Sequence, residues 1–145
     1  MKAVIQRVQE AEVRVDEILI GSIDKGILIY LGIEENDSEM QLNKLADKIV
    51  KFRMFSDQEG KMNLNVKEVE GKILVVSQFT LCASLKKGNR PSFDPAASPE
   101  KALNFYNQFV NLLKLKNIEV QTGKFGADMK VKYQNNGPVT FIFEL

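Results

Sequence analysis

The sequence predicts a single α/β domain, with two main helices and a mixed, strongly curved β-sheet that resembles a barrel. The chain has 145 residues, which is an ordinary size for one domain, and we expect that domain to cover residues 1–145. Several short segments are rich in β-branched residues, as strands are. Two longer segments repeat apolar residues every three or four positions, as amphipathic helices do.

The composition restricts the chemistry that the protein can perform. The chain contains no histidine, which excludes catalytic triads and zinc sites that depend on imidazole. The single cysteine, Cys82, cannot form a disulfide within the chain, and no signal-peptide pattern is found at the start. No apolar run approaches the roughly 20 residues that span a bilayer. We therefore expect a cytoplasmic protein with no membrane partner, no metal and no cofactor.

The first third of the chain is predicted to be mainly β. Residues 2–8 and 12–15 alternate between apolar and polar side chains, and residues 17–23 follow a turn at Asp16. Residues 26–33 form a nearly continuous apolar run with β-branched side chains. Such a run is typical of a strand that is buried on both faces.

Two segments have the spacing of helices. Residues 38–52 repeat apolar side chains at helical intervals, and either Asp37 or Ser38 can cap the start. Ser98 precedes Pro99 and an acidic residue, which is the pattern of a helix start. The apolar stripe that follows is assigned to the core and consists of Ala102, Phe105, Tyr106, Phe109, Val110 and Leu113.

The remaining segments are predicted to be strands and connections. Residues 52–55 and 62–66 flank a polar turn and predict a hairpin, and residues 72–80 contain a second buried strand. Strands are also expected at residues 118–121, 129–134 and 139–145. An Asn-Gly pair between the last two strands favours a tight hairpin turn there.

Four segments carry residues that can do chemistry, although each also has a plainer structural interpretation that is commoner. Ser77–Thr80 follows a buried strand directly, where hydroxyls can act as nucleophiles and backbone amides can form an oxyanion hole. Residues 88–93 form a basic turn whose aromatic residue can stack on a base. Residues 124–129 combine small residues with Phe and Met, and so leave space for a flat ring. The fourth segment is Gly137-Pro138.

The charge is distributed unevenly along the chain. Residues 1–71 contain 10 basic and 14 acidic side chains, whereas residues 72–145 contain 10 basic and 5 acidic ones. Lys86, Lys87 and Arg90 lie in a stretch without acidic residues. A solvated loop is the commoner interpretation of such a cluster. The alternative is a patch that faces phosphates of a nucleic acid bound transiently.

Together these segments resemble the D-aminoacyl-tRNA deacylase family. Residues 77–81 and 136–140 are similar to the two signature motifs of that family. Four other pieces match in the same order, at residues 6–8, 60–63, 90–93 and 125–129. Each piece alone is weak, but six in order over the whole chain are specific. Cys82 is a local departure, because relatives often carry Tyr there.

The resemblance implies a homodimeric hydrolase with the fold of this family. Its substrates would be tRNAs esterified at the terminal ribose with a D-amino acid, or with glycine on tRNA(Ala). It also implies a cis bond between Gly137 and Pro138, which enter the partner's active site and reject L side chains by clash. Arg7 would orient this gate by donating to backbone carbonyls.

The same resemblance assigns the remaining site residues. The pocket floor and the oxyanion site would consist of Ser77, Gln78, Phe79 and Thr80. The pocket for the terminal adenine would be lined by Phe125, Gly126, Ala127 and Met129. From charge and loop position alone, we expect Lys86, Lys87 and Arg90 to hold phosphates. The expected partner is tRNA, and DNA is not expected.

The absence of histidine bears on mechanism. We expect the protein to position the ester and stabilise its oxyanion, while the ribose 2′-hydroxyl helps to activate water. A covalent mechanism through Thr80 ranks second, because no suitable base is apparent beside it. A hypothesis from another class is a non-catalytic RNA- or ligand-binding module on a curved sheet. That hypothesis gives no reason for Gly137-Pro138 beside a separate polar strand end.

Overall fold

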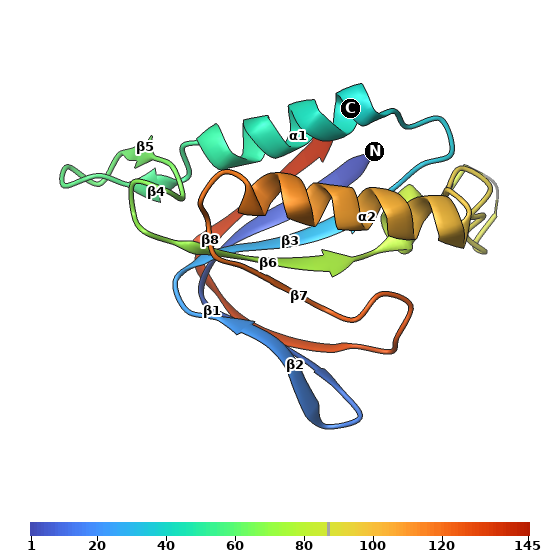
Figure 1. The fold of residues 1–145 in the computed structure, drawn as a ribbon, viewed down its shortest axis with the longest axis horizontal. Coiled ribbons are helices and arrows are strands. Elements are labelled where there is room, and N and C mark those ends of the chain that lie inside the picture. Colours follow the sequence, from blue (N-terminus) through green and yellow to red (C-terminus); the bar gives the residue numbers. More distant parts are fainter. Residues whose placement is uncertain (87) are drawn as a thin grey trace.

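The structure is a computed structural model that describes residues 1–86 and 88–145. Two helices lie together over one face of a curved sheet (Figure 1). The helices are α1 (Glu39–Lys51) and α2 (Pro99–Lys114), with a short 3-10 helix η1 (Phe79–Cys82). The main sheet contains β1 (Lys2–Val15), β2 (Ile18–Ile23), β3 (Gly26–Gly32), β6 (Lys72–Ser77), β7 (Val120–Thr122) and β8 (Lys130–Glu144). A small separate hairpin consists of β4 (Phe55–Ser56) and β5 (Met62–Leu64).

The sheet is mixed, as the sequence predicts. Strands β3, β6 and β7 are parallel neighbours, and the connections between them carry the two helices. Strand β1 is antiparallel to β3 along its first half and to β2 along its second half, while β8 follows its other edge. One long strand therefore has to bend from one set of neighbours to the next, which curves the whole sheet.

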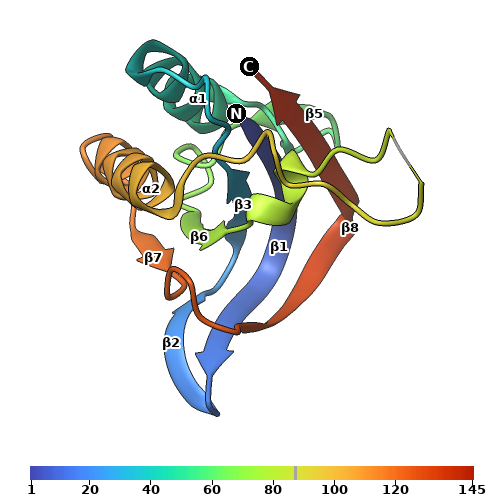
Figure 2. The same cartoon turned by 90° about the vertical axis from the view of Figure 1, so that its right-hand side faces the viewer.

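The curvature almost closes the sheet into a barrel. The end strand β2 bends back toward β7 at the other end of the sheet (Figure 2). At this contact a Cβ on Gly21 would lie only 2.5 Å from the backbone oxygen of Thr122. The two strands can approach so closely because Gly21 has no side chain. The predicted fold class is thus confirmed.

Two apolar clusters lie on opposite faces of the sheet. The larger one joins the inward faces of both helices to strand residues such as Ile5, Ile29 and Val75. The smaller one fills the curved side and includes Leu28 and Leu74. Because β3 and β6 contribute to both clusters, they are buried on both faces, as their continuous apolar sequences predict.

The helix boundaries follow from local sequence. The Ser38 hydroxyl accepts a hydrogen bond from the Gln41 amide, and the Gln41 side chain accepts one from the Ser38 amide, which completes a capping box. The Ser98 hydroxyl accepts from the Lys101 amide, and Pro99 occupies the first turn. Both predicted helices are confirmed. No helix in the described ranges is long and apolar enough to cross a membrane.

The predicted hairpin turn near the end of the chain is wrong. Strand β8 runs without reversal from Lys130 to Glu144. Its partners on β1 pass from Gln6, opposite Thr140, to Val8, opposite Asn135, so residues 136–139 bulge from the ladder. Asn-Gly favours a turn locally, but pairing with β1 on both sides of the bulge keeps the strand direction.

Candidate active site at the end of the parallel strands

A cavity of about 540 Å³ lies at the carboxyl ends of β3 and β6. This position follows from topology, since parallel strands with helical crossovers leave a crevice beyond their carboxyl ends. The cavity brings together two segments that the sequence predicts to be functional. The predicted residues that line it are Ser77, Gln78, Phe79, Phe125, Gly126, Ala127 and Met129.

The floor of the cavity is formed where β6 ends. The Gln78 amide still donates to the Leu31 carbonyl at 2.8 Å, after which the chain enters η1. The first hydrogen bond of η1 is made by the Leu81 amide to the Gln78 carbonyl. The amides of Phe79 and Thr80 precede this bond and have no partner within the helix. Of the two residues, Phe79 lines the cavity, so a free donor lies at the cavity floor.

Thr80 is held next to this floor but does not line the cavity. Its hydroxyl accepts a hydrogen bond from the Gln78 side-chain amide at 2.5 Å. An amide N–H is a donor and cannot remove a proton, so Gln78 does not activate this hydroxyl. The contact orients Thr80 relative to the floor.

The mouth of the cavity continues into the basic loop. The Phe79 ring is 58% exposed and lies 5.0 Å, centroid to centroid, from the Phe93 ring. Ser84 and Ser92 exchange backbone hydrogen bonds of 2.7 and 3.1 Å, which close the base of the loop. Lys86 and Arg90 are exposed on this loop. The predicted phosphate contact Lys87 lies outside the described residues.

The opposite wall is aromatic and well supported. The Phe125 ring lies 5.7 Å from the Tyr106 ring, and the Tyr106 hydroxyl donates to the Val75 carbonyl at 2.8 Å. Burial raises the pKa of Tyr106 above its usual value, so this phenol remains neutral at physiological pH. From the sequence, Tyr106 is predicted to be a core residue only. Helical periodicity reports a buried face and does not indicate that one buried residue also borders a cavity.

Cys82 is placed behind the floor and is not poised for catalysis. Its thiol is buried and lies 3.5 Å from the Ile33 carbonyl, to which it donates. Burial is the main cause that raises the pKa of Cys82 to about 11. Since only the thiolate is nucleophilic, this cysteine is inert at neutral pH.

The structure does not bring Gly137 and Pro138 to the cavity of their own chain. They lie in the bulge of β8 opposite Arg7, which pairs with Ile27 on β3. The cavity residue Leu31 is four positions further along β3, a separation of about 13 Å at roughly 3.3 Å per residue. Both residues of the dipeptide are exposed, and the bond between them is cis.

Arg7 holds the bulge by its backbone. Its Nε donates to the Asn136 carbonyl at 3.0 Å, and a terminal nitrogen donates to the Met54 carbonyl at 2.8 Å. A Cβ on Gly137 would lie 3.0 Å from the guanidinium and 2.7 Å from a Val139 methyl group. The guanidinium thus lies against the dipeptide and connects it to the segment after α1.

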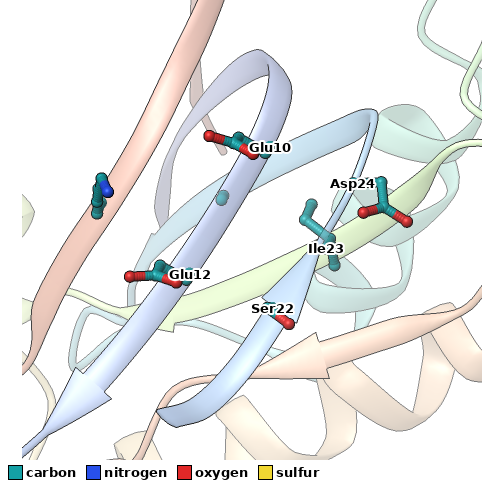
Figure 3. A pocket seen from close by; sticks show the side chains of 7 residues that line it. Glu10, Glu12, Ser22, Ile23 and Asp24 are labelled. Atoms are coloured by element: carbon teal, nitrogen blue, oxygen red, sulfur yellow. The ribbon is translucent and has the colours of Figure 1, made fainter. Parts of the chain in front are cut away.

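A second cavity, of about 330 Å³, is lined by three acidic side chains and by Lys132. Figure 3 shows Glu10 and Glu12 on β1 beside Ser22 and Asp24, at the open end of the β1–β2 hairpin, away from its turn. A hydrogen bond from Arg14 is the main cause that lowers the pKa of Glu12, so this carboxylate is charged at neutral pH. Within the described ranges, no group of three acidic, Cys or His side chains is arranged to hold a metal. The charges around this cavity are largely paired, because Glu12 forms an ion pair with Arg14 and Asp24 forms one with Lys72. The exposed loop with Lys86 and Arg90 contains no acidic side chain between them.

Comparison with known proteins agrees with this geometry. The model of the D-Tyr-tRNA(Tyr) deacylase family matches residues 4–144. A D-aminoacyl-tRNA deacylase of Marinomonas sp. (strain MWYL1) is 54% identical over 144 residues, which cover 99% of this chain and 100% of the relative. One of Alteromonas mediterranea is 52% identical over 145 residues and 100% of both chains.

Two solved structures are also similar. The c-Myc DNA unwinding element binding protein superposes with a TM-score of 0.94 at 42% identity, covering 100% of this chain and 99% of that one. A probable eukaryotic D-amino acid tRNA deacylase has a TM-score of 0.86 at 15% identity over 99% and 98% of the two chains, which shows the shared fold. From the full-length sequence matches and the common fold, this chain belongs to the D-aminoacyl-tRNA deacylase family.

Proposed function

We propose that this protein is a cytoplasmic homodimer that hydrolyses the ester between a D-amino acid and the terminal ribose of tRNA. The observation that carries the proposal is the cavity in which the floor after β6 meets the Phe125–Met129 wall. One side of this cavity offers backbone donors for an ester carbonyl, and the other offers an aromatic surface for the terminal adenine. Full-length family membership supports the same reaction.

The proposed reaction uses water as the nucleophile. Water attacks the ester carbonyl, and the resulting oxyanion accepts hydrogen bonds from the Phe79 and Thr80 amides. The ribose 2′-hydroxyl orients this water. As the C–O bond breaks, a proton of the attacking water passes to the departing 3′-oxygen, which gives the free amino acid and the tRNA 3′-hydroxyl. Covalent catalysis by Thr80 ranks second, because its hydrogen-bond neighbour Gln78 is a donor and the chain has no histidine to act as base.

Chiral selection is proposed to occur across the dimer. Gly137 and Pro138 are exposed and remote from their own cavity, so they can border a site only in another copy. In a two-fold dimer in which one chain's bulge covers the other chain's cavity, the reverse contact forms as well, because such an interface is reciprocal. Backbone oxygens near the substrate Cα then clash with an L side chain and leave room for a D side chain or glycine. Glycyl-tRNA(Ala) is therefore a proposed substrate as well.

The sheet offers a surface for this association. Phe141 and Phe143 of β8 pack edge-on against Phe52 on the helix side. The alternating residue Ile142 therefore faces away from the helices and is 70% exposed. We infer that this face, which no helix in the described ranges covers, meets a second copy in the dimer.

A mixed dimer tests the gate directly. One subunit carries Gly137→Ala and the other Gln78→Ala, so a gate in trans leaves one site with an intact floor and an intact gate. We expect D-Tyr-tRNA hydrolysis at about half the wild-type rate with L-Tyr-tRNA spared, since one of two sites is complete. The measurement is deacylation of both tRNAs by purified mixed dimers.

The two parent homodimers are the controls for this experiment, because each has a defect in both of its sites. If the gate acts in cis, each site keeps the defect of its own subunit. The mixed dimer would then hydrolyse both tRNAs at the mean of the two parental rates. A fully active and discriminating monomer would also contradict the proposal.

The basic loop is expected to contribute affinity without selectivity. Replacing both Lys86 and Arg90 with Ala removes two phosphate contacts, so the slope of log K against log salt should decrease by roughly 1.4 to 1.8. Binding should weaken by a similar factor for different tRNAs, as measured by filter binding from 50 to 300 mM salt, roughly the range where screening changes most. A change in amino-acid selectivity with unchanged affinity would contradict this role.

The alternative is a nucleic-acid-binding module without catalysis. The name of one similar structure, the c-Myc DNA unwinding element binding protein, favours this class. Incubation with D-Tyr-tRNA and L-Tyr-tRNA separates the two candidates, because a binding module retains both esters intact. Absence of DNA binding stays a prediction, which a competition assay with duplex DNA tests.

A further inference from the structure

The β4–β5 hairpin carries a polar network that the reaction above does not use. At its turn the Asp57 carboxylate accepts hydrogen bonds of 2.9 Å from the backbone amides of Glu59 and Lys61. The Asn63 side-chain amide donates to the other oxygen of Asp57 at 2.6 Å. This bond from Asn63 is the main cause that lowers the pKa of Asp57, so the carboxylate is charged at neutral pH.

Arg53 connects this turn to the start of the hairpin. Its Nε donates to the Asn63 carbonyl at 2.6 Å, and a terminal nitrogen donates to the Asn63 side-chain oxygen at 2.9 Å. The guanidinium thus binds one residue through two parallel bonds, which fixes direction as well as distance. The segment before β4 is thereby held at a fixed position relative to β5.

Met54, which follows Arg53 in the chain, links the hairpin to the bulge. Met54 is completely buried, and its carbonyl accepts the 2.8 Å hydrogen bond from Arg7. The same guanidinium donates to the Asn136 carbonyl at 3.0 Å, immediately before Gly137. Hydrogen bonds therefore connect Asp57 to Asn63 and Asn63 to Arg53. Arg53 is joined by its peptide bond to Met54, whose carbonyl accepts the hydrogen bond from Arg7.

We propose that Asp57, Asn63 and Arg53 are positioning residues that hold the Met54 carbonyl in place and, through Arg7, set the orientation of the Asn136–Pro138 backbone. This inference rests on the proposed gate. The planar guanidinium of Arg7 is located by two carbonyls from different segments. If the Met54 carbonyl is no longer held in a fixed position, the guanidinium can rotate and the Asn136 carbonyl can move with it.

The requirement for precision comes from the way that the gate works. A clash between a backbone oxygen and an L side chain separates L from D substrates only if that oxygen keeps its position to within a fraction of an ångström. A displacement of about 1 Å in an active site can change a rate by roughly 100-fold. Residues 136–138 are exposed and leave the β1 ladder, so their position depends on side-chain contacts. The hairpin supplies a rigid support for them.

The test uses Asn63→Ala, which removes both the acceptor for Arg53 and the donor to Asp57. We expect the ratio of D-Tyr-tRNA to L-Tyr-tRNA hydrolysis, as kcat/KM, to fall about tenfold, with D-Tyr-tRNA hydrolysis itself changing less than about threefold. Deuterium exchange of the peptide covering residues 134–141 should become faster. The matched control is Gln58→Ala, an exposed change in the same turn, which should alter neither measurement.

A second variant and a double mutant keep the test decisive. Arg53→Lys keeps the charge but loses the paired bonds to Asn63, and should reproduce the fall in the ratio. In an Arg7→Ala background, Asn63→Ala should have no further effect, because both act through the same contact. If Asn63 only stabilises the fold, the decreases in the ratio caused by Arg7→Ala and Asn63→Ala should add, and they should be proportional to the loss of thermal stability.

The outcomes also separate this inference from the gate itself. If Arg7→Ala lowers the ratio but Asn63→Ala and Arg53→Lys leave it unchanged, the gate stands and the positioning role is wrong. If Arg7→Ala and Gly137→Ala both leave the ratio unchanged, the gate is wrong and this inference falls with it.

Discussion

A substrate that carries D-tyrosine on the 3′-oxygen of a terminal 2′-deoxyribose is expected to be hydrolysed about 100- to 1000-fold more slowly than the ribose substrate. The floor after β6 supplies hydrogen-bond donors, and Gln78 beside Thr80 is not a base. The proposed mechanism therefore takes the group that orients water from the RNA. The measurement is single-turnover deacylation of both substrates at saturating enzyme, which separates the chemical step from binding.

Thr80→Ala is the informative comparison for that experiment. It removes a hydroxyl that lies next to the floor but keeps both backbone amides, so we expect a loss of only about tenfold. Equal rates for the ribose and deoxyribose substrates would exclude assistance by the 2′-hydroxyl. Isolation of an ester on Thr80 would instead establish the covalent mechanism.

Gly26→Ala is expected to prevent stable folding. Gly26 pairs with Lys72 at the start of the parallel β3–β6 ladder, and a Cβ there would lie 1.9 Å from the Lys72 backbone oxygen. Relief requires the two strands to separate at a point where the next pair, Ile27 and Ile73, is completely buried. We expect a loss of roughly 3 to 5 kcal/mol of unfolding free energy, a large value for one substitution.

Urea unfolding followed by circular dichroism measures this change. If the variant folds, its melting temperature should be lower by roughly 10 to 20 °C. Lys25→Ala is the neighbouring control, because that exposed side chain can be shortened without affecting the ladder. A Gly26→Ala protein with wild-type stability would mean that the two strands do not approach this closely.

Elements defined by local patterns were predictable from the sequence. The helix predicted over residues 38–52 is observed over Glu39–Lys51, because its periodicity and its capping box lie within one segment. The bulge in β8 was not predictable in the same way. Asn-Gly is a turn signal in isolation, and the alignment of both flanking segments on β1 is a long-range pairing that no window of residues contains.

The candidate site was predictable in part for the same reason. Ser77–Phe79 and Phe125–Met129 each have a recognisable local composition, but their meeting in one cavity depends on the order of β3, β6 and β7. The contact of Arg7 with the Met54 carbonyl gave no signal, because a backbone acceptor is present at every residue. The hairpin itself was predicted from its local pattern, but that pattern did not indicate its connection to Arg7.

The sequence by itself determined the fold class, both helices, the absence of imidazole chemistry and the segments that resemble a known family. Only the tertiary structure decided that the cavity lies at one end of β3 and the Gly137-Pro138 bulge near the other, and that Arg7 joins this bulge to the hairpin. Periodicity and turn chemistry depend on residues a few positions apart, whereas these arrangements depend on which distant strands pair and in which register.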